Sequence, residues 1–330
     1  MRRRVNLVFF LLLLVASPLI LFSRFLAFTQ LFFEHAGIGI TQDHIARGHA
    51  ANQPNHTAQL IPRIIHRIFH DWHNQSMPAD WEEARQTCID ANPDWKDMLW
   101  TEETSRDFIR RSYPWFLNTY DGYRFPVQRV DATKYFLMLH YGGIYLDLDN
   151  GCLQSLEPLL YLPTWTTDGG RGALSNNILG SVPATAFWRL LTDSLIRYNY
   201  NYLFPYITIS YASGQWFETA IWQTYHAGSA HGDNPLADSN RPLHRIMMDD
   251  RPDAPPWIFF TQLRGGTWVN WDNDLFLWIG DHLVLLAVAI CALVALVWRA
   301  SVRWLGRGCR LRAQNYVVAW EYQAKEVPNV

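Results

Sequence analysis

Hydrophobic residues gather in long runs at both ends of the chain. Near the N-terminus, residues 5–22 are almost entirely apolar and follow the three arginines at positions 2–4. About 20 apolar residues span the hydrocarbon core of a bilayer, so residues 1–23 predict a signal-anchor transmembrane helix. A cleaved signal peptide is the alternative. The length of the run favours the anchor, because the apolar part of a signal peptide usually has about 7–15 residues.

A second apolar run covers residues 275–298 and predicts a C-terminal transmembrane helix. Asp281 and His282 interrupt it, and the uninterrupted remainder would be about 24 Å long as a helix, slightly short for a bilayer. Placing these two residues near the lipid headgroups removes the shortfall. Arginines follow, so 299–330 is expected to be a basic cytosolic tail, because positive charge marks the cytosolic side.

The region between the two runs is therefore expected in the lumen of the secretory pathway. Residues 34–59 are polar, lack apolar periodicity and contain several glycines, so we predict a lumenal stem over residues 24–60. At residue 61 the pattern changes to "IPRIIHRIF", a β-branched run typical of a central strand. We predict that a catalytic domain occupies residues 61–274.

Within this domain, strand-like and helix-like segments alternate. A polar helical segment ends at Asn92-Pro93, "KDMLW" (96–100) reads as a strand, and 102–111 reads as a helix. Residues 126–141 predict a helix that begins at a proline and ends at Gly142-Gly143, before a short strand "IYLDLD" (144–149). This alternation predicts an α/β fold with a mainly parallel central sheet.

Composition adds little about the substrate. The chain is 49% hydrophobic and 18% charged with a net charge of −2, so it is globular and no overall positive field points to nucleic acid. Cys88 and Cys152 can pair in an oxidising lumen, and sequons begin at Asn55 and Asn74. No phosphate-binding loop, serine triad context or C-x-x-C pair is present, so phosphoryl-transfer and thiol chemistries have no support.

Asp147 and Asp149 are acidic residues in an otherwise apolar stretch. On a strand they would point to one side, about 6.6–7 Å apart. Ligands in α/β sheets bind beyond the carboxyl ends of strands, where these two carboxylates are expected. A divalent cation would offset their repulsion, and Mn²⁺ or Mg²⁺ leaves coordination positions for the oxygens of a diphosphate. We therefore predict a metal that holds a diphosphate-bearing substrate.

The surrounding string resembles the signature of glycosyltransferase family 32, the DXD sugar-binding family. That pattern runs D-x-x-R/K-Y-x-x-L-x-x-Y-G-G-x-Y-x-D-x-D. The matching residues here are Asp131, Lys134, Tyr135, Leu137 (adjacent to the family leucine), Tyr141, Gly142, Gly143, Tyr145, Asp147 and Asp149. Residues 61–69 resemble the opening strand of the family, and 174–188 and 212–222 resemble its later segments. The resemblance covers about residues 61–272.

The resemblance implies a GT-A fold and a metal-dependent hexosyltransferase. Within the family, the chain most resembles the group that shares both membrane segments and transfers mannose from GDP-mannose to inositol phosphorylceramide with retention. That implies residence in the Golgi membrane, a sphingolipid acceptor and a possible small regulatory membrane subunit. The implied catalytic residues are Asp147, Asp149 and Asp131, with Asp147, Asp149 and Asp272 at the metal. The implied substrate-binding residues are Ile64, His66, Lys134, Tyr135, Gly142, Gly143, Tyr145, Asn176, Ser213, Gly214, Trp268 and Asn270.

The chain departs from the family pattern in its last segment, where the family often has G-x-S/T-W-H. Here Val269 replaces the histidine, and valine cannot bind a metal. Asn270 or Asp272 can supply an oxygen instead. An alternative interpretation of this change is that the chain is a catalytically weak paralogue that acts as a scaffold or regulatory subunit. A second alternative keeps the chemistry but transfers mannose to protein-linked glycans.

Two further patterns have more than one interpretation. His66 and His70 are four residues apart in a predicted strand, where a zinc site is poorly supported and a structural role is expected. The tyrosine-rich stretch 198–211 is either an aromatic edge of the domain or a rim at the membrane interface.

Overall fold

The computed structural model describes most of the chain between residues 16 and 300. The described residues are 16–17, 19–20, 22–33, 35–51, 59–71, 76–170, 172–230, 242–249, 254, 256–263, 265 and 269–300. Most of the predicted anchor (1–23) and nearly all of the predicted tail (299–330) lie outside these residues. The chain divides into two units, Met1–Val269 and Asn270–Val330.

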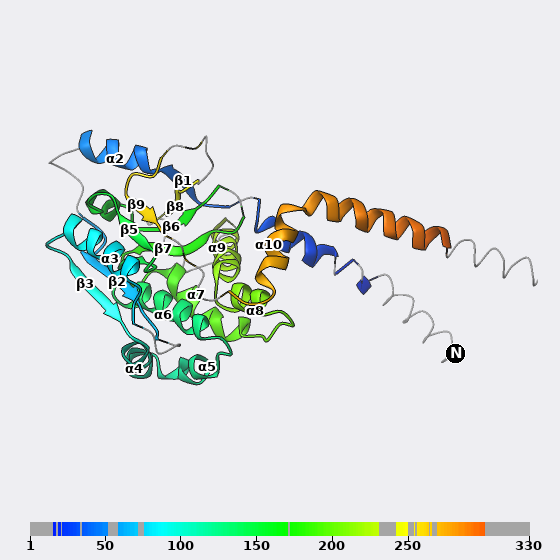
Figure 1. Cartoon of the computed structure of the whole chain (residues 1–330), viewed down its shortest axis with the longest axis horizontal. Coiled ribbons are helices and arrows are strands. Elements are labelled where there is room, and N and C mark those ends of the chain that lie inside the picture. The colour runs from blue at the N-terminus through cyan, green and yellow to red at the C-terminus, as the bar shows by residue number, and fades with distance from the viewer. Residues whose placement is uncertain are drawn as a thin grey trace, which may run out of the picture. The chain divides into compact units, whose positions relative to one another are not determined.

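The first unit is built on a seven-stranded sheet with the order β1-β8-β6-β7-β4-β2-β3 (Figure 1). Its strands are β1 (Ile38–Thr41), β2 (Ile64–Ile68), β3 (Lys96–Trp100), β4 (Gly143–Leu146), β6 (Thr164–Asp168), β7 (Ser175–Ser181) and β8 (Leu243–Met247). Neighbouring strands are parallel except where β7 pairs with β4 and β6. The prediction of an α/β fold with a mostly parallel sheet is confirmed.

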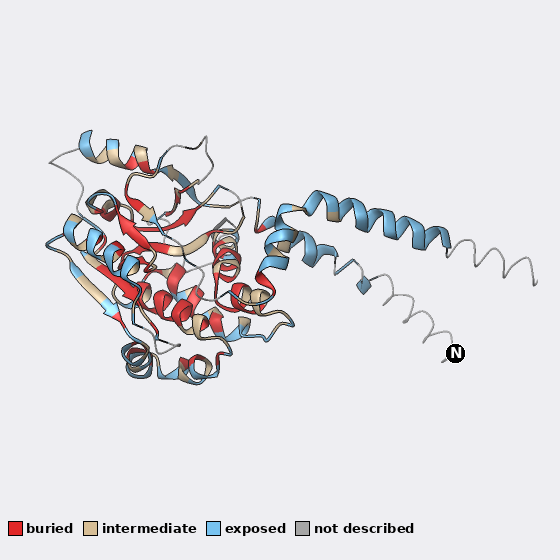
Figure 2. Cartoon of the chain, in the orientation of Figure 1, coloured by how far each residue is buried: buried red, intermediate tan, exposed pale blue. Residues whose placement is uncertain are grey.

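Helices cover both faces of this sheet. In the first unit they are α2 (Gln42–Ala51), α3 (Ala79–Ala91), α4 (Glu102–Ser112), α5 (Leu117–Gly122), α6 (Pro126–His140), α7 (Ala186–Tyr198), α8 (Pro205–Ala212) and α9 (Gln215–Ala230), with 3₁₀ turns at Pro114–Phe116 and Glu157–Tyr161. One core cluster joins α6, α7 and α9 to the sheet, and a second lies with α2 and α3. On β4, Tyr145 belongs to the first cluster, whereas Ile144 and Leu146 belong to the second. The inner strands β2, β4 and β6 and helix α6 are accordingly among the most buried elements (Figure 2).

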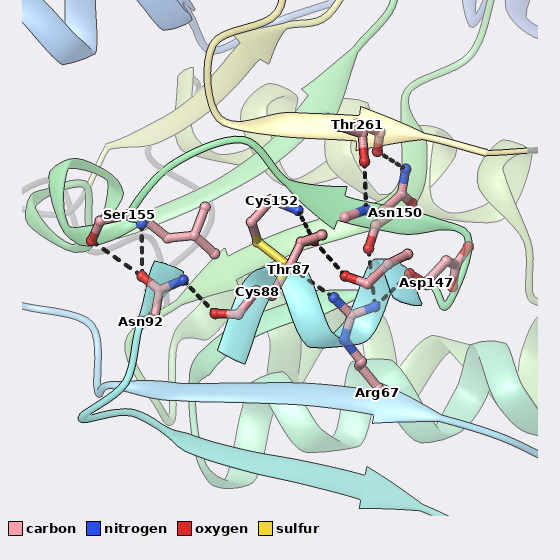
Figure 3. The surroundings of a disulfide bond; sticks show 12 residues. Arg67, Thr87, Cys88, Asn92, Asp147, Asn150, Cys152, Ser155 and Thr261 are labelled. Atoms are coloured by element: carbon pink, nitrogen blue, oxygen red, sulfur yellow. Dashed lines mark hydrogen bonds between the residues drawn. A yellow bond between two sulfur atoms is a disulfide. The ribbon is translucent and has the colours of Figure 1, made fainter. Parts of the chain in front are cut away.

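A small second sheet pairs β5 (Asn150–Cys152) with β9 (Phe260–Gln262) in antiparallel register. Its first strand is bonded to α3 through the disulfide Cys88–Cys152, so the structure joins the two cysteines whose pairing the sequence left open (Figure 3). The bond links residues 64 positions apart. It fixes the chain directly after Asp147 and Asp149 to the helix behind them.

The predicted stem over residues 24–60 was wrong for most of its length. β1 is an edge strand of the main sheet, and α2 follows it. The side-chain oxygen of Gln42 accepts hydrogen bonds from the main-chain N–H groups of Ile258 and Phe259, and Trp222 donates to the carbonyl of Ala36 at 2.8 Å. Main-chain pairing, polar side-chain contacts and the buried side chain of Ile45 hold this segment to the domain. One buried apolar residue leaves no apolar period in the sequence.

Helix α6 confirms the prediction for residues 126–141 to within one residue. Pro126 occupies its first turn, where a missing N–H costs nothing. The chain then turns sharply, because Gly142 and Gly143 have φ values of +63° and +91°. A Cβ at Gly142 would lie 2.5 Å from the carbonyl oxygen of Ser181. The glycine pair therefore lets α6 lead directly into β4 beside a neighbouring strand.

The predicted strand over 144–149 was too long. β4 ends at Leu146, and Asp147 makes one further main-chain bond, donating to Asn177 at 2.8 Å. Leu148 and Asp149 then form a turn in which Asn150 N–H donates to the Asp147 carbonyl at 3.0 Å. The two aspartates thus lie at the carboxyl end of the strand and not on it.

The second unit contains α10 (Asn273–Asp281) and a helix over Leu283–Ala300. The latter has 18 residues and a mean hydropathy of 2.6, and it is the one helix among the described residues that is long and apolar enough to cross a membrane. The predicted span over 275–298 is thus two helices that meet at His282. This break falls where the charged residues interrupt the apolar run.

Candidate active site

Lys134 on α6 lies between two carboxylates. Its ammonium nitrogen is 3.2 Å from an oxygen of Asp131 on the same helix and 3.2 Å from an oxygen of Asp147 beyond β4. Burial acts to lower the pKa of Lys134, but Asp147 and Asp131 together raise it above its ordinary value. The ammonium therefore stays charged and offsets the cost of burying the acidic groups.

Three further predicted residues complete this network around Asp131. The amide of Asn176 donates to Asp131 at 3.1 Å and to the Tyr135 hydroxyl at 2.9 Å. Ser213 donates its hydroxyl proton to the second Asp131 oxygen at 3.1 Å, and its carbonyl accepts from Tyr135 at 2.8 Å. Segments from α6, β7 and the end of α8, far apart in the sequence, are thereby held at one point. Gly214 follows, with its N–H bonded to the carbonyl of Ile209.

Asp147 uses one carboxylate oxygen inside the protein. That oxygen accepts from Lys134 and, at 2.5 Å, from the hydroxyl of Tyr145, two residues earlier on the same face. Burial and the neighbouring Asp147 raise the pKa of Tyr145 well above its usual value, so it stays a donor. The Asp147 side chain remains one-third exposed, at 33%. It is therefore both anchored and open to a ligand.

Asp149 lies in the turn after Asp147. Burial, together with the nearby charge of Asp147, raises the pKa of Asp149 to about 6. Its main-chain carbonyl accepts from Leu263 at 2.7 Å, and a Cβ at Gly265 would contact its carboxylate. Leu263 and Gly265, which follow β9, therefore lie against Asp149, and a larger residue at position 265 would displace the Asp149 side chain. Sequence reasoning missed Gly265, although its segment was singled out.

Arg67 on β2 is a second residue that sequence reasoning missed. Its guanidinium is fully buried and donates to the carbonyl of Asp147 at 3.2 Å, to that of Asn150 at 3.0 Å, and to the sulfur of Cys88 at 3.0 Å (Figure 3). Burial lowers the pKa of Arg67 to about 10, so it remains charged at neutral pH. An arginine in a strand otherwise made of three isoleucines and a histidine was the available signal, because a buried guanidinium requires acceptors.

His66 has a structural role for its side chain. Its Nδ1 accepts from the indole N–H of Trp100 at 3.2 Å, so Nε2 carries the proton and donates to the Gly142 carbonyl at 3.0 Å. Burial lowers the pKa of His66 to about 4, which keeps the ring neutral. Both ring nitrogens are thus used within the protein. The predicted contacts of His66 and Ile64 with a substrate would therefore be made by main-chain groups, and they remain predictions.

Of the remaining predicted site residues, one has a packing role in the structure, and the predicted contacts of the other three are not tested by it. Gly143 is needed for packing, since a Cβ there would lie 2.7 Å from the Ile64 carbonyl oxygen. Trp268 lies outside the described residues, and Asn270 and Asp272 belong to the second unit. Their contacts with a substrate or metal stay predictions.

The residues at this site fit a divalent metal that takes some of its ligands from the protein and the others from a substrate or water. Within the described part of the chain, no three or more His, Cys, Asp or Glu side chains form a group able to hold a metal alone. Asp147 and Asp149 nevertheless offer two carboxylates, and burial together with the charge of Asp147 keeps the pKa of Asp149 high. A cation would relieve this repulsion, and Mn²⁺ or Mg²⁺ with two carboxylates takes its remaining ligands from water or phosphate oxygens.

Comparison with known proteins places the site in a known sequence family. Residues 78–165 match the family described as "Glycosyltransferase sugar-binding region containing DXD motif". This range includes Asp131, Lys134, Asp147 and Asp149, the acidic and basic centre of the network.

The chain is also similar to curated fungal proteins. It is 37% identical to inositol phosphoceramide mannosyltransferase 2 of Schizosaccharomyces pombe over 230 residues, which are 70% of this chain and 64% of the relative. It is 36% identical to a mannosyl phosphorylinositol ceramide synthase of Saccharomyces cerevisiae over 226 residues, 68% of this chain and 57% of the relative. The chain thus spans somewhat less than two thirds of the length of these relatives.

Among solved structures, the PaToxG glycosyltransferase aligns with a TM-score of 0.36 and 14% identity over 50% of this chain and 69% of that chain. The family match and the curated relatives confirm the resemblance that the motif predicted. Residues 78–165 are thus similar to the glycosyltransferase sugar-binding region that contains the DXD motif.

Proposed function

We propose that the chain is a membrane-bound, retaining glycosyltransferase of the GT-A type. The reaction is transfer of mannose from GDP-mannose to inositol phosphorylceramide. The observation that carries the proposal is the position of Asp147 and Asp149 at the carboxyl end of β4, with Asp147 linked through Lys134 to Asp131. The printed names of the curated relatives, which refer to mannose and inositol phosphoceramide, support this choice of donor sugar and acceptor.

Asp147 and Asp149 are the residues that would hold the metal, and their oxygens suit Mn²⁺ and Mg²⁺ alike. When bound, the ion would stabilise negative charge on the departing diphosphate, an effect worth several kcal/mol in metal-dependent enzymes. The protein's own part is to keep the carboxylates in place. Lys134 and Tyr145 hold the Asp147 side chain, and Arg67 holds the main chain of the turn.

Asp131 is proposed to orient the donor sugar. Its oxygens are fixed by Lys134, Asn176 and Ser213, so a sugar hydroxyl that enters the site would meet a carboxylate of set orientation. Such pre-positioning lowers the entropic cost of reaching a reactive geometry. No nucleophile is assigned for the retaining reaction.

The proposed location is the Golgi membrane, with the catalytic unit in the lumen. The apolar N-terminal run and the helix Leu283–Ala300 support membrane attachment, and the Cys88–Cys152 disulfide suits an oxidising lumen. The proposal includes a small regulatory membrane subunit as a partner and no nucleic acid.

One observation favours a second function, that of a catalytically weak scaffold. Val269, which replaces the family histidine, has an apolar side chain that is 62% exposed. It can neither bind a metal nor donate a hydrogen bond to a diphosphate. Transfer to protein-linked glycans instead of a lipid is a third candidate with the same donor chemistry.

GDP release from GDP-mannose by the purified full-length chain, with and without Mn²⁺, tests the proposal. We expect Asp149→Asn to lower metal-dependent release by at least about 100-fold, because the metal would lose a charged ligand. Asp43→Asn, which changes an exposed carboxylate on α2, is the matched control and should behave like wild type. Equal inactivity of wild type and Asp149→Asn would favour the scaffold. Supplying inositol phosphorylceramide or a mannoprotein as acceptor separates the two transferase candidates.

A further inference from the structure

An exposed aromatic surface is formed by two segments that are distant in the sequence. One is the helix over residues 22–30, and the other is the loop 199–204 between α7 and α8. Phe25 in the helix is 61% exposed, and in the loop Tyr200 is 65% and Leu203 87% exposed. We refer to these two segments together as the aromatic surface.

Ring contacts show that the two segments are neighbours. Phe28 of the N-terminal helix packs against Tyr211 on α8, with ring centroids 6.0 Å apart. Tyr211 contacts Tyr202 at 5.8 Å, and Tyr202 contacts Tyr200 at 6.4 Å. A continuous row of aromatic rings therefore runs from the helix into the loop.

A second set of contacts fixes the end of the N-terminal helix to the domain. Phe28 and Phe32 pack against Trp216 on α9 with centroid distances of 5.2 and 5.3 Å. Tyr206 of α8 contacts the same indole at 5.6 Å. The helix thus meets α8 and α9 through half-buried rings, while its other aromatic side chains face outward.

The chemistry of the aromatic surface is that of a membrane interface. Residues 198–217 contain no Asp, Glu, Lys or Arg, and Arg24 is the one charged residue in the helix over 22–30. Tyrosine and tryptophan are enriched where a protein meets lipid headgroups, because each combines an apolar ring with a polar group. A long arginine side chain can extend to the aqueous boundary from such a position.

We propose that the aromatic surface lies in the interfacial layer of the bilayer, on its lumenal side. The proposal rests on the membrane attachment in the proposed function. The helix over 22–30 continues directly from the apolar run at 5–22, which is about as long as a bilayer is thick. Because Phe28 and Phe32 hold the end of this helix against α8 and α9, the loop 199–204 beside it meets the same lipid surface.

Helix α8 connects the aromatic surface to the active site. It begins directly after Phe204 and ends directly before Ser213, whose hydroxyl donates to Asp131. Eight helical residues are about 12 Å long. A lipid acceptor whose acyl chains stay in the bilayer would therefore present its headgroup close to the site. The aromatic surface would set the height of the catalytic unit above the membrane.

Depth-dependent fluorescence quenching tests this placement. The full-length chain, with Cys291 and Cys309 changed to serine and the disulfide kept, would carry one fluorophore at Leu203→Cys. In phosphatidylcholine vesicles with bromine atoms near the glycerol end of the acyl chains, we expect severalfold stronger quenching at position 203 than at a Trp115→Cys control. Trp115 is also an exposed aromatic residue, in the turn between α4 and α5, away from the N-terminal helix (Figure 1). Equal quenching at both positions would overturn the proposal.

A kinetic measurement gives a second readout. Leu203→Asp should raise the KM for a vesicle-borne lipid acceptor by about tenfold, or about 1.4 kcal/mol, and leave the KM for GDP-mannose unchanged, because an apolar contact with the lipid is replaced by a charge. Leu203→Trp should behave like wild type. An unchanged acceptor KM in Leu203→Asp contradicts the proposal. If the fluorophore at position 203 is quenched but the chain transfers no mannose, the membrane placement of the aromatic surface is supported and the proposed function is refuted.

Discussion

The guanidinium of Arg67 donates a hydrogen bond to the main-chain carbonyl of Asp147 across 3.2 Å, from the strand next to β4. The same nitrogen reaches the carbonyl of Asn150, so Arg67 bridges the turn that carries both candidate metal ligands. Its other terminal nitrogen contacts Cys88 of the disulfide. A buried cation thus connects the covalent crosslink to the acidic turn.

Arg67→Met should destabilise the protein and weaken its affinity for Mn²⁺. The change removes the charged donor of the hydrogen bonds to the Asp147 and Asn150 carbonyls, and a hydrogen bond to a charged group contributes about 1.5–3 kcal/mol. Arg63→Met is the matched control, because Arg63 pairs with Glu157 at the surface, where an ion pair contributes about 0–1 kcal/mol. Urea denaturation and a Mn²⁺ titration measure the two effects. Equal behaviour of both variants would show that Arg67 does not support the turn.

Gly142→Ala should lower stability because of local geometry. Alanine at this position would adopt φ +63° and place its Cβ 2.5 Å from the Ser181 carbonyl oxygen. We expect a loss well above the roughly 1 kcal/mol that a positive φ alone costs a non-glycine residue. Gly172→Ala separates the two causes, since Gly172 has φ +79° but open space around it. Thermal unfolding of both variants measures the difference, and equal losses would argue against the steric explanation.

Glu218 on α9 should make stability fall as the pH rises. Burial raises the pKa of Glu218 from its ordinary value of 4.5 to about 8, and Thr166 donates to one of its oxygens at 2.9 Å. Between about pH 4.5 and pH 8 the folded state retains a proton that the unfolded state releases. The contribution of this residue therefore decreases by up to about 1.4 kcal/mol per pH unit.

Glu218→Gln should remove this dependence and be more stable than wild type above neutral pH. Glu103→Gln, on the surface of α4, should leave the profile unchanged. Unfolding free energy measured as a function of pH decides the question. A Glu218→Gln profile parallel to that of wild type would mean that the carboxyl group does not titrate in this range.

The disulfide should contribute strongly to stability. Replacing Cys88 and Cys152 by serine removes a crosslink between positions 64 residues apart, and losing such a bond typically costs about 2–5 kcal/mol. Cys291→Ser, a change at an exposed free cysteine, should have little effect. Denaturation under non-reducing conditions compares the variants. An unaffected double variant would show that α3 and β5 are held by their other contacts.

The sequence by itself determined those features that depend on local chemistry. The alternation of strand and helix patterns predicted the mostly parallel sheet, and Pro126 and the glycine pair predicted the ends of α6. The acidic motif also predicted where the charged centre lies. In each case the information is carried by residues that are neighbours along the chain.

Tertiary structure decided what depends on contacts between distant segments. β1 joins the sheet through main-chain bonds to β8, which leave no trace in side-chain periodicity. Arg67 and Gly265 acquire their roles only because β2 and the loop after β9 are brought against the turn at Asp147–Asp149. β4 ends before that turn because Asn150 begins a separate sheet with β9. A sequence pattern indicates local conformational preferences. Burial and hydrogen-bond partners depend on which distant segments pack together, and only the folded molecule shows this.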